Sequence, residues 1–295
     1  KNIIYTDLDI FSSFFKNDSI TITGTNGKST TCKLLFEVLK KQKYDVKLVG
    51  NIGYPILSTK NISKKSFFII EASSYQLDYS RIFSSKYGVI LNISPDHLER
   101  HKTLNNYIAA KFNLLKNQKK GSTAFLNKND LFIKKQIKKN SYKSNIVKVD
   151  TNLINKPLIK IENDYFFSNS NKENLCFIFE IAKKLKIKSK TILDTVKNFK
   201  GLKYRQQKIY QNKDIRIFND SKSTSYSSSI EMLKSKNSIY WLLGGIPKKG
   251  DKFKLAKKYH KNIKAFIFGK NVKKFSYDLK NKISFKKFKS LKNAL

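Results

Sequence analysis

The chain has 295 residues, enough for about two domains, and its two cysteines, Cys32 and Cys176, lie far apart, which favours a reducing compartment over a disulfide scaffold. Only four of its 61 basic residues are arginine, the residue that supplies bidentate phosphate contacts, so the net charge of +40 does not indicate a specific nucleic acid partner. No apolar run approaches the roughly 18 to 20 residues of a membrane span, and the start lacks the charge order of a signal peptide, so we expect a cytoplasmic protein.

The most informative segment begins at Ser19. A β-branched run, Ser19–Thr23, leads into GTNGKST and then into an apolar pattern of helical period over Thr30–Lys41. A strand, a glycine loop and a helix N-terminus in this order are typical of a phosphate-binding loop, because backbone N–H groups and the helix dipole then face the phosphate oxygens. The pattern G-x-x-x-x-G-K-[ST] is matched only in part, since Ile22 stands at its first Gly. The segment predicts binding of a nucleoside triphosphate.

Strand-like and helical stretches alternate through most of the chain. This alternation is typical of βα units and mainly parallel sheets, so the predicted fold class is α/β. The strands that we expect are Ser19–Thr23, Ser66–Ile70, Gly88–Asn92, Ser122–Leu126, Ile215–Phe218, Ile239–Leu243 and Ala265–Phe268. The helices that we expect are Thr30–Lys41, Leu104–Lys116, Glu173–Leu185, Ser189–Phe199, Ser225–Ser235 and Lys252–Tyr259.

The polar stretch Lys128–Asn171 differs from this alternation. Its short alternating pieces fit small antiparallel strands at a sheet edge. These pieces are Ile146–Val149, Leu158–Ile161 and Tyr165–Phe167.

Gly201, which lies between an apolar helix and a second βα series, marks the expected domain boundary. We expect a P-loop central domain over residues 18–201 and a partial Rossmann-like domain over residues 202–295. The chain opens without Met inside an alternating segment, and Ser290–Leu295 reads as the opening of a helix after few strands. These features predict that residues 1–17 are the tail of a further N-terminal domain and that the C-terminal domain is incomplete.

Glu71 follows the apolar run FFII and would emerge at the carboxyl end of a buried strand. Ligands bind at that edge of an open parallel sheet. A carboxylate there, near a loop hydroxyl such as Ser29, suits Mg²⁺, which prefers hard oxygen ligands and phosphate oxygens. The alternative interpretation of the segment EASS is a structural helix cap.

The segment Asn92–His101 places an Asp, a Glu, two His and an Arg directly after another apolar strand. Metal ligation or phosphate contact explains this density better than a solvated turn does. We therefore favour a functional role for His97 and interpret His260 as a structural residue.

Three lysines also stand in suggestive positions. Lys111 has small and apolar neighbours, although by itself it would be interpreted as a snorkelling surface lysine. Lys222 lies among hydroxyl residues in NDSKSTS, and Lys248 follows two glycines in GGIPKKGD. Both segments follow predicted strands and suit carboxylate or phosphate recognition, although either alone could be an ordinary βα loop.

Taken together, these segments resemble the motifs of the Mur ligases, ATP-dependent enzymes that form amide bonds in peptidoglycan precursor synthesis. The motifs are GTNGKST, GNIG, EASSYQL, LNISPDHLERH, AAK, GLKYR, NDSKSTS and GGxxK. They span nearly the whole chain in a fixed order, which makes the match more specific than any single motif. The segment NDSK with a following hydroxyl residue resembles the branch of the family that adds D-glutamate.

The resemblance implies an ATP site and two magnesium positions. The implied ATP contacts are Gly24, Thr25, Asn26, Gly27, Lys28, Ser29, Thr30, Asn171, Asn174, Arg205 and Asp220. For Mg²⁺ it implies Ser29 with Glu71, and His97 with Lys111, which matches the lysine that is carbamylated by CO₂ in this family. The implied catalytic residues are Lys28, Glu71, His97, Lys111 and Lys222.

The implied substrates are UDP-N-acetylmuramoyl-L-alanine and D-glutamate. Asn51 and Ser73 match positions near the sugar substrate, and Lys222, Thr224 and Lys248 match the pocket for phosphate and D-glutamate. In this chemistry a carboxylate is activated as an acyl phosphate, which an amine then displaces, so the site needs positioning and charge neutralisation more than a nucleophilic side chain. The family's uridine-binding domain would be represented by residues 1–17 alone, so we expect this chain to bind ATP and Mg²⁺ more readily than it completes the reaction.

Two departures and three alternatives accompany this resemblance. SNSN stands where the family has Gly-x-His-Asn, and Ser225 replaces an Asn. The alternatives are another amino-acid-adding Mur ligase, a folylpolyglutamate synthetase and, more distantly, a basic nucleic-acid-binding P-loop module. We expect a monomer with no membrane span.

Overall fold

The computed structural model describes residues 3–155, 161, 163–166, 168–234, 238–247 and 251–295. The chain divides into two compact units, Lys1–Leu202 (unit 1) and Lys203–Leu295 (unit 2), which we describe separately. Lys248 and all but the last residue of the expected strand Leu158–Ile161 lie outside the described residues. Within the described ranges, no helix has both the length and the apolar character needed to cross a bilayer.

A six-stranded sheet forms the centre of unit 1, in the order β2-β3-β1-β4-β5-β6. Every neighbouring pair in this sheet is parallel, which confirms the predicted α/β fold class. The strands are β1 (Ser19–Thr23), β2 (Val46–Gly50), β3 (Phe67–Glu71), β4 (Tyr87–Ile90), β5 (Thr123–Asn127) and β6 (Asn145–Val149). Strands β1, β3 and β5 are buried at every position, because helices cover both faces of the sheet.

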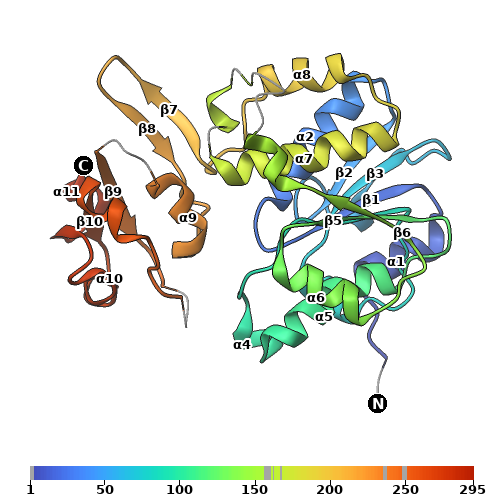
Figure 1. The fold of residues 1–295 in the computed structure, drawn as a ribbon, viewed down its shortest axis with the longest axis horizontal. Coiled ribbons are helices and arrows are strands. Elements are labelled where there is room, and N and C mark those ends of the chain that lie inside the picture. Colours follow the sequence, from blue (N-terminus) through green and yellow to red (C-terminus); the bar gives the residue numbers. More distant parts are fainter. Residues whose placement is uncertain (1–2, 156–160, 162, 167, 235–237, 248–250) are drawn as a thin grey trace. The chain divides into compact units, whose positions relative to one another are not determined.

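Helices form a layer on each face of this sheet (Figure 1). Helices α2 (Lys28–Lys41), α7 (Asn169–Lys184) and α8 (Ser189–Asn198) lie on one face. The elements on the other face are α1 (Asp7–Phe14), α5 (Leu104–Lys116) and α6 (Leu131–Lys139). Two short helices, α3 (Ser74–Tyr79) and α4 (Leu98–His101), contact α5. The loops at the carboxyl ends of the strands, which carry part of the predicted site, therefore project from a three-layer body.

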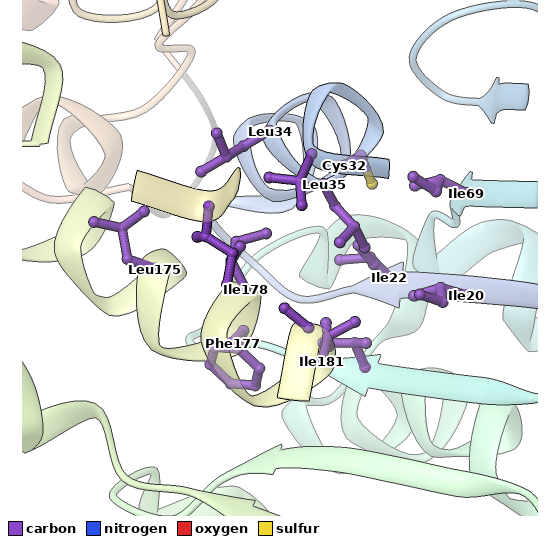
Figure 2. Packing of buried hydrophobic residues seen from close by; sticks show 14 of the residues in the cluster. Ile20, Ile22, Cys32, Leu34, Leu35, Ile69, Leu175, Phe177, Ile178 and Ile181 are labelled. Atoms are coloured by element: carbon purple, nitrogen blue, oxygen red, sulfur yellow. The ribbon is translucent and has the colours of Figure 1, made fainter. Parts of the chain in front are cut away.

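Two hydrophobic cores hold these layers together. Ile20 and Ile22 of β1 pack with Leu35 of α2 and with Ile178 and Ile181 of α7 (Figure 2). The second core forms on the opposite face. It includes Leu8, Phe11, Phe68, Ile70, Ile90, Phe112 and Leu126. Each fully buried Leu, Ile or Phe side chain contributes roughly 1.5 to 3 kcal/mol to folding, so both cores fix the strand ends firmly.

Unit 2 contains a parallel sheet of order β11-β10-β9 and a separate antiparallel hairpin, β7-β8. Its strands are β7 (Gln207–Gln211), β8 (Arg216–Asn219), β9 (Ile239–Gly244), β10 (Ile263–Phe268) and β11 (Ser284–Phe288). Its helices are α9 (Tyr226–Leu233), α10 (Val272–Leu279) and α11 (Leu291–Ala294). The core of this unit is built around Tyr226, Phe253, Ala265, Ile267, Phe275 and Leu279.

Three predicted elements differ from the structure. Strand β6, expected to be antiparallel, is parallel to β5, because α6 forms a crossover between them. Lys252–Tyr259 is not an α-helix: Phe253 and Leu255 both point into the core at a spacing of two, and only Lys257–Asn262 forms a 3₁₀ turn. Tyr165 and Phe166, expected in a strand, lie in the 3₁₀ turn Asp164–Phe166.

Candidate functional site

The phosphate loop connects β1 to α2 as expected. Gly27 is the N-cap of α2, has φ +84° and provides no side-chain cap, so the first turn of this 14-residue helix presents its N-terminus without a capping group. A Cβ atom at Gly27 would lie 2.3 Å from Oδ1 of Asn174, so only glycine lets α7 approach the loop this closely. An uncapped helix N-terminus next to glycines is suited to bind an anion.

Asn92, a residue that sequence reasoning did not assign to the site, braces the phosphate loop. Its Oδ1 accepts hydrogen bonds from the N–H groups of Thr25 (3.1 Å) and Asn26 (2.8 Å), and its Nδ2 donates to Asn26 O (3.1 Å). The N–H of Thr25 also donates to the carbonyl oxygen of Asn92 over 3.0 Å. Since these two N–H groups are occupied, the N-terminus of α2, rather than the start of the loop, offers donors to a phosphate.

Lys28 points back onto its own loop. Its Nζ donates to the carbonyl oxygens of Gly24 (2.9 Å) and Thr25 (3.0 Å). This arrangement keeps an ammonium group beside the N-terminus of α2, where it adds to the positive potential of the helix dipole. The position suits a lysine that moves onto phosphate oxygens when a nucleotide binds.

Lys111, from α5, is buried beside the same loop and is only 1% exposed. Its Nζ donates to Gly24 O over 2.9 Å and lies 4.5 Å from the ring centroid of Tyr107. Burial, and then the charge of Lys28, lower the pKa of the Lys111 amine well below its usual value, while Asp96 acts in the opposite direction. The protonated form of this amine is therefore less favoured than that of an exposed lysine.

Glu71 lies at the carboxyl end of β3, in register with Ile22 of β1, and is 4% exposed. Among the described residues, no group donates a hydrogen bond to its Oε2. Its charge acts on a neighbouring thiol: burial, and then Glu71, raise the pKa of Cys32, whereas Lys28 lowers it. A buried carboxylate oxygen without a partner is costly, so its position beside the loop fits a cation bound there.

The loop that follows β4 places His97 near α3. The Nδ1 atom of His97 lies 2.9 Å from the hydroxyl oxygen of Tyr75, and its Nε2 lies 3.4 Å from Oδ2 of Asp96. The same loop contacts the phosphate loop, because Ser94 N donates to Oγ1 of Thr25 over 3.0 Å. His97 and the phosphate loop are thus joined through one short segment.

The structure holds the predicted sugar-substrate residues close to Glu71. The N–H of Asn51 donates to Glu71 O over 3.0 Å, and a Cβ at Gly50 would lie 2.4 Å from the same oxygen. Ser73 begins α3 in a capping box with Gln76, so its hydroxyl is engaged within the protein. The interpretation of EASS as a structural helix cap is therefore correct for Ser73. It does not exclude a separate role for Glu71.

The predicted adenine side lies where α7 meets α2. Asn171 Nδ2 donates to Tyr165 O over 2.7 Å, and the Tyr165 hydroxyl lies 3.1 Å from Oγ1 of Thr30. Asn174 is 3% exposed, and in the described part of the chain its Nδ2 has no hydrogen-bond partner. Asn174 therefore offers a buried amide donor next to the phosphate loop.

Within unit 2, residues 203–205 of the GLKYR segment lie beside the NDSK segment. Lys222 N donates to Tyr204 O over 3.0 Å, and Gln206 N donates to Oδ1 of Asp220 over 3.0 Å. Burial raises the pKa of Asp220, while Ser223, Gln206 and Arg205 act to lower it. The side chains of Lys222 and Thr224 are exposed. Arg205, Asp220 and Lys222 thus form one neighbourhood within this unit.

No group of three or more His, Cys, Asp or Glu side chains within the described ranges is arranged to hold a metal ion. A divalent cation would therefore need oxygens from a bound phosphate and water in addition to protein ligands. Mg²⁺ commonly binds in that way, with one or two carboxylates and the phosphates of a substrate. Oε2 of Glu71, which has no hydrogen-bond partner in the described part of the chain, fits such a partial ligand set.

The parallel sheet, the glycine loop at a helix N-terminus and the converging lysines define a P-loop α/β protein. The family profile described as "Mur ligase middle domain" matches residues 22–239 of the chain. The chain belongs to the Mur ligase family, as the sequence motifs predicted.

Curated relatives share one name. The "UDP-N-acetylmuramoylalanine--D-glutamate ligase" of Rickettsia felis is 33% identical over 96% of this chain and 66% of its own length. The protein of that name from Buchnera aphidicola subsp. Schizaphis graminum is 35% identical over 99% of this chain and 69% of its own length. The chain therefore spans about two thirds of the length of these relatives.

Solved structures show the same fold. The crystal structure of MurF from Acinetobacter baumannii superposes with a TM-score of 0.69 at 15% identity, over 97% of this chain and 70% of that one. MurF ligase from Thermotoga maritima in complex with ADP gives a TM-score of 0.67 at 15% identity, over 95% and 73% of the two chains. At this identity the likeness establishes the fold alone.

Proposed function

We propose that this chain carries out ATP-dependent amide bond formation, adding D-glutamate to UDP-N-acetylmuramoyl-L-alanine in the synthesis of peptidoglycan precursors. The observation that carries the proposal is the buried Oε2 of Glu71, which has no hydrogen-bond partner among the described residues, together with the uncapped N-terminus of α2. A magnesium triphosphate would supply a cation to the first and an anion to the second. The name shared by the relatives supports the choice of substrates. Because the reaction consumes ATP, we place it in the cytoplasm.

The chain's own groups would mainly position the substrates and neutralise charge. Mg²⁺ would be held by Ser29 and Glu71, with a second ion at His97, and it would offset the charge of the triphosphate. Lys28 would move from the carbonyl oxygens of its loop to the β and γ phosphate oxygens. The first-turn N–H groups of α2 are fixed in place, so they need no reorganisation as charge develops.

The proposed reaction has two transfers. An oxygen of the substrate carboxylate bonds to the γ-phosphorus as the bond from phosphorus to ADP breaks. The D-glutamate amine then bonds to the acyl carbon, the carbon–oxygen bond to phosphate breaks, and the ammonium nitrogen loses its proton. Positioning of this kind is the main catalytic contribution in phosphoryl transfer.

Lys111 has a distinct proposed role as a carbamate. Its neutral amine would attack CO₂, forming a carbon–nitrogen bond and releasing a proton, which turns the neutral amine into an anionic carbamate. Burial and the charge of Lys28 support this proposal, because both disfavour the ammonium form. In unit 2, Arg205, Asp220, Lys222, Thr224 and Lys248 remain the residues proposed to contact nucleotide, phosphate and D-glutamate.

The test is the amino acid dependence of phosphate release. The chain is supplied with ATP, Mg²⁺ and UDP-N-acetylmuramoyl-L-alanine, and D-glutamate is compared with L-glutamate, L-alanine and diaminopimelate. Selective stimulation by D-glutamate supports the proposal. Selective stimulation by another amino acid would assign the chain to a different branch, and stimulation by L-glutamate with a folate substrate would point to a folylpolyglutamate synthetase.

A matched pair of lysine variants tests the site itself. Lys28→Met should weaken binding of Mg·ATP and lower phosphate release by about 100-fold, the scale of losing one charge-stabilising donor. Lys33→Met, on the same helix, removes a partly exposed lysine that pairs with Glu37 at 3.3 Å and should leave both unchanged. Equal behaviour of the two variants in nucleotide calorimetry would contradict the proposed site.

A further inference from the structure

Tyr75 and His97 are joined by a hydrogen bond between two different elements. The phenol oxygen of Tyr75, in α3, lies 2.9 Å from Nδ1 of His97, the N-cap residue of α4. His97 has φ +54°, a left-handed conformation that is uncommon for a residue other than glycine. The N–H of His97 donates to Oδ1 of Asp96 over 3.0 Å, which supports this backbone conformation. The imidazole is therefore held from both its backbone and its ring.

The ring of Tyr75 is itself fixed from behind by His101. The two rings stack with centroids 5.6 Å apart and an interplanar angle of 12°. His101 is 4% exposed, and its Nε2 lies 2.9 Å from the hydroxyl oxygen of Ser74. His101 also meets the edge of Tyr107, whose hydroxyl lies 3.1 Å from Oγ1 of Thr25 in the phosphate loop. Tyr75 therefore belongs to a packed series of rings that begins at this loop.

A hydrogen bond at one imidazole nitrogen decides what the other nitrogen can do. When the partner accepts the Nδ1–H proton, Nε2 keeps a free lone pair for a metal ion. When the partner donates a hydrogen bond to Nδ1, Nε2 carries the proton and has no lone pair with which to bind a metal ion. A phenol can act in either way. Glu99, with its Oε1 3.5 Å from the same Nδ1, favours a proton on Nδ1, whereas Asp96, with its Oδ2 3.4 Å from Nε2, favours a proton on Nε2 until a cation takes that place beside the carboxylate.

We propose that Tyr75 is a positioning residue that holds His97 in the Nδ1–H tautomer and thereby directs Nε2 to a divalent cation. This inference rests on the proposed function, in which His97 binds magnesium. It adds a residue from the EASSYQL segment that acts on the cation only through His97. Outer partners of metal-binding histidines typically change metal affinity by about 10- to 100-fold when removed.

Tyr75→Phe removes the hydroxyl while keeping the ring that stacks on His101. Tyr79→Phe is the matched control, because it removes another hydroxyl from the same helix, one that contacts the guanidinium of Arg100 instead. A thermal midpoint for each variant close to that of the wild type establishes that both are folded.

The first readout needs no metal. The chain has three histidines, so ¹⁵N-labelled histidine gives few ring signals, and a His97→Gln variant assigns those of His97. In the wild type and in Tyr79→Phe we expect a protonated Nδ1 and an unprotonated Nε2 at His97 at pH 8. In Tyr75→Phe we expect the tautomers to become mixed or reversed. An unchanged tautomer in Tyr75→Phe overturns the inference.

The second readout is the binding of Mn²⁺ in the presence of ADP, followed by electron paramagnetic resonance and by broadening of the His97 signals. We expect about tenfold weaker Mn²⁺ binding in Tyr75→Phe and no change in Tyr79→Phe. If Mn²⁺ binds at His97 in the wild type and binds with the same affinity in Tyr75→Phe, this inference is overturned and the proposed function is not. Absence of any broadening at wild-type His97 overturns the cation site of the proposed function, and the inference with it.

Discussion

Lys28 and Lys111 share one acceptor: the Nζ atoms of both lysines donate to the carbonyl oxygen of Gly24, each over 2.9 Å. One lysine comes from the phosphate helix and the other from α5, on the opposite face of the sheet. An ammonium group at Lys111 would be repelled by that of Lys28 on the same oxygen, and the burial of Lys111 increases this cost. The pair is therefore arranged for an anion, and without one it lowers the stability of the folded chain.

Lys111→Met should stabilise the chain in the absence of ligands. The pKa of Lys111 is lowered by burial and by Lys28, so the unfolded state binds this proton more readily and stability rises with pH up to the unfolded pKa of about 10.4. At pH 7 we expect the variant to be more stable than the wild type, because methionine carries no proton whose binding the folded state disfavours. The measurement is urea unfolding at pH 7 and pH 9.5, in buffer purged of CO₂.

The difference in free energy of unfolding between Lys111→Met and the wild type should be smaller at pH 9.5 than at pH 7. Lys116→Met, an exposed position on the same helix, is the control and should change neither value. A difference that grows with pH would show that the buried amine is not the source of the strain.

Glu71→Gln should change stability and ligand binding in opposite directions. It removes a buried charge whose Oε2 lacks a hydrogen-bond partner among the described residues, so the thermal midpoint without ligand should stay equal or rise. In the wild type, Mg·ADP should raise the thermal midpoint. In Glu71→Gln this increase should disappear, because the proposed cation ligand is lost. Glu37→Gln, on α2, is the control. A normal Mg·ADP shift in Glu71→Gln would remove Glu71 from the site.

Asn92→Ala should weaken ATP binding without abolishing the fold. The substitution removes three side-chain hydrogen bonds that hold the phosphate loop in shape. We expect about tenfold weaker binding in calorimetry, equivalent to about 1.4 kcal/mol, with the loss in KM for ATP rather than in kcat. Asn140→Ala, at the end of α6, is the control. Unchanged ATP affinity would mean that the loop keeps its shape without Asn92.

Asp9→Asn should destabilise unit 1 and alter its response to acid. Burial alone would raise the pKa of Asp9, but backbone N–H donors from Thr6, Ile82, Phe83 and Arg81 bring it below its usual value. The stabilisation is therefore present above the unfolded pKa of about 3.9 and is lost as the pH falls through the lower folded value. At pH 7 we expect a loss of about 3 kcal/mol, because amide hydrogens would face backbone donors.

The check for Asp9→Asn is unfolding by urea from pH 7 to pH 3. The difference in free energy of unfolding between the wild type and Asp9→Asn should become smaller below pH 4. Asp194→Asn, which removes an exposed partner of Lys41, provides the baseline for general acid effects. If this difference in free energy of unfolding does not change with pH, the charge of Asp9 does not contribute to the stability of unit 1.

Elements with a strong local signal were predictable from the sequence. The buried strands β1 and β3 are unbroken apolar or β-branched runs, and α5 was predicted with its observed bounds, Leu104–Lys116. Strands β2, β7 and β11 were missed, because each carries Lys or Gln and, of all their residues, only Val49 is buried. Helix α6 was missed for a related reason: only Ile133 of its lysine-rich sequence is buried.

In unit 1 the site was predictable at the level of motifs, because the predicted loops follow strands of one parallel sheet. The hydrogen bonds between loops were not predictable. Asn92 lies inside a motif that was quoted for its His and Asp residues, and its amide contacts a loop 66 residues earlier in the chain. Tyr75 likewise gains its role from a ring and a hydroxyl partner that only tertiary packing brings together.

Gly201 lies one residue before the end of unit 1, with φ +71°. A Cβ atom there would lie 2.3 Å from the ring of Tyr165, whose hydroxyl meets Thr30 at the start of the phosphate helix. Even a methyl group at position 201 would displace that ring and loosen its hold on the nucleotide loop. The ring of Tyr165 thus couples the backbone conformation at Gly201, near the end of unit 1, to the first turn of helix α2.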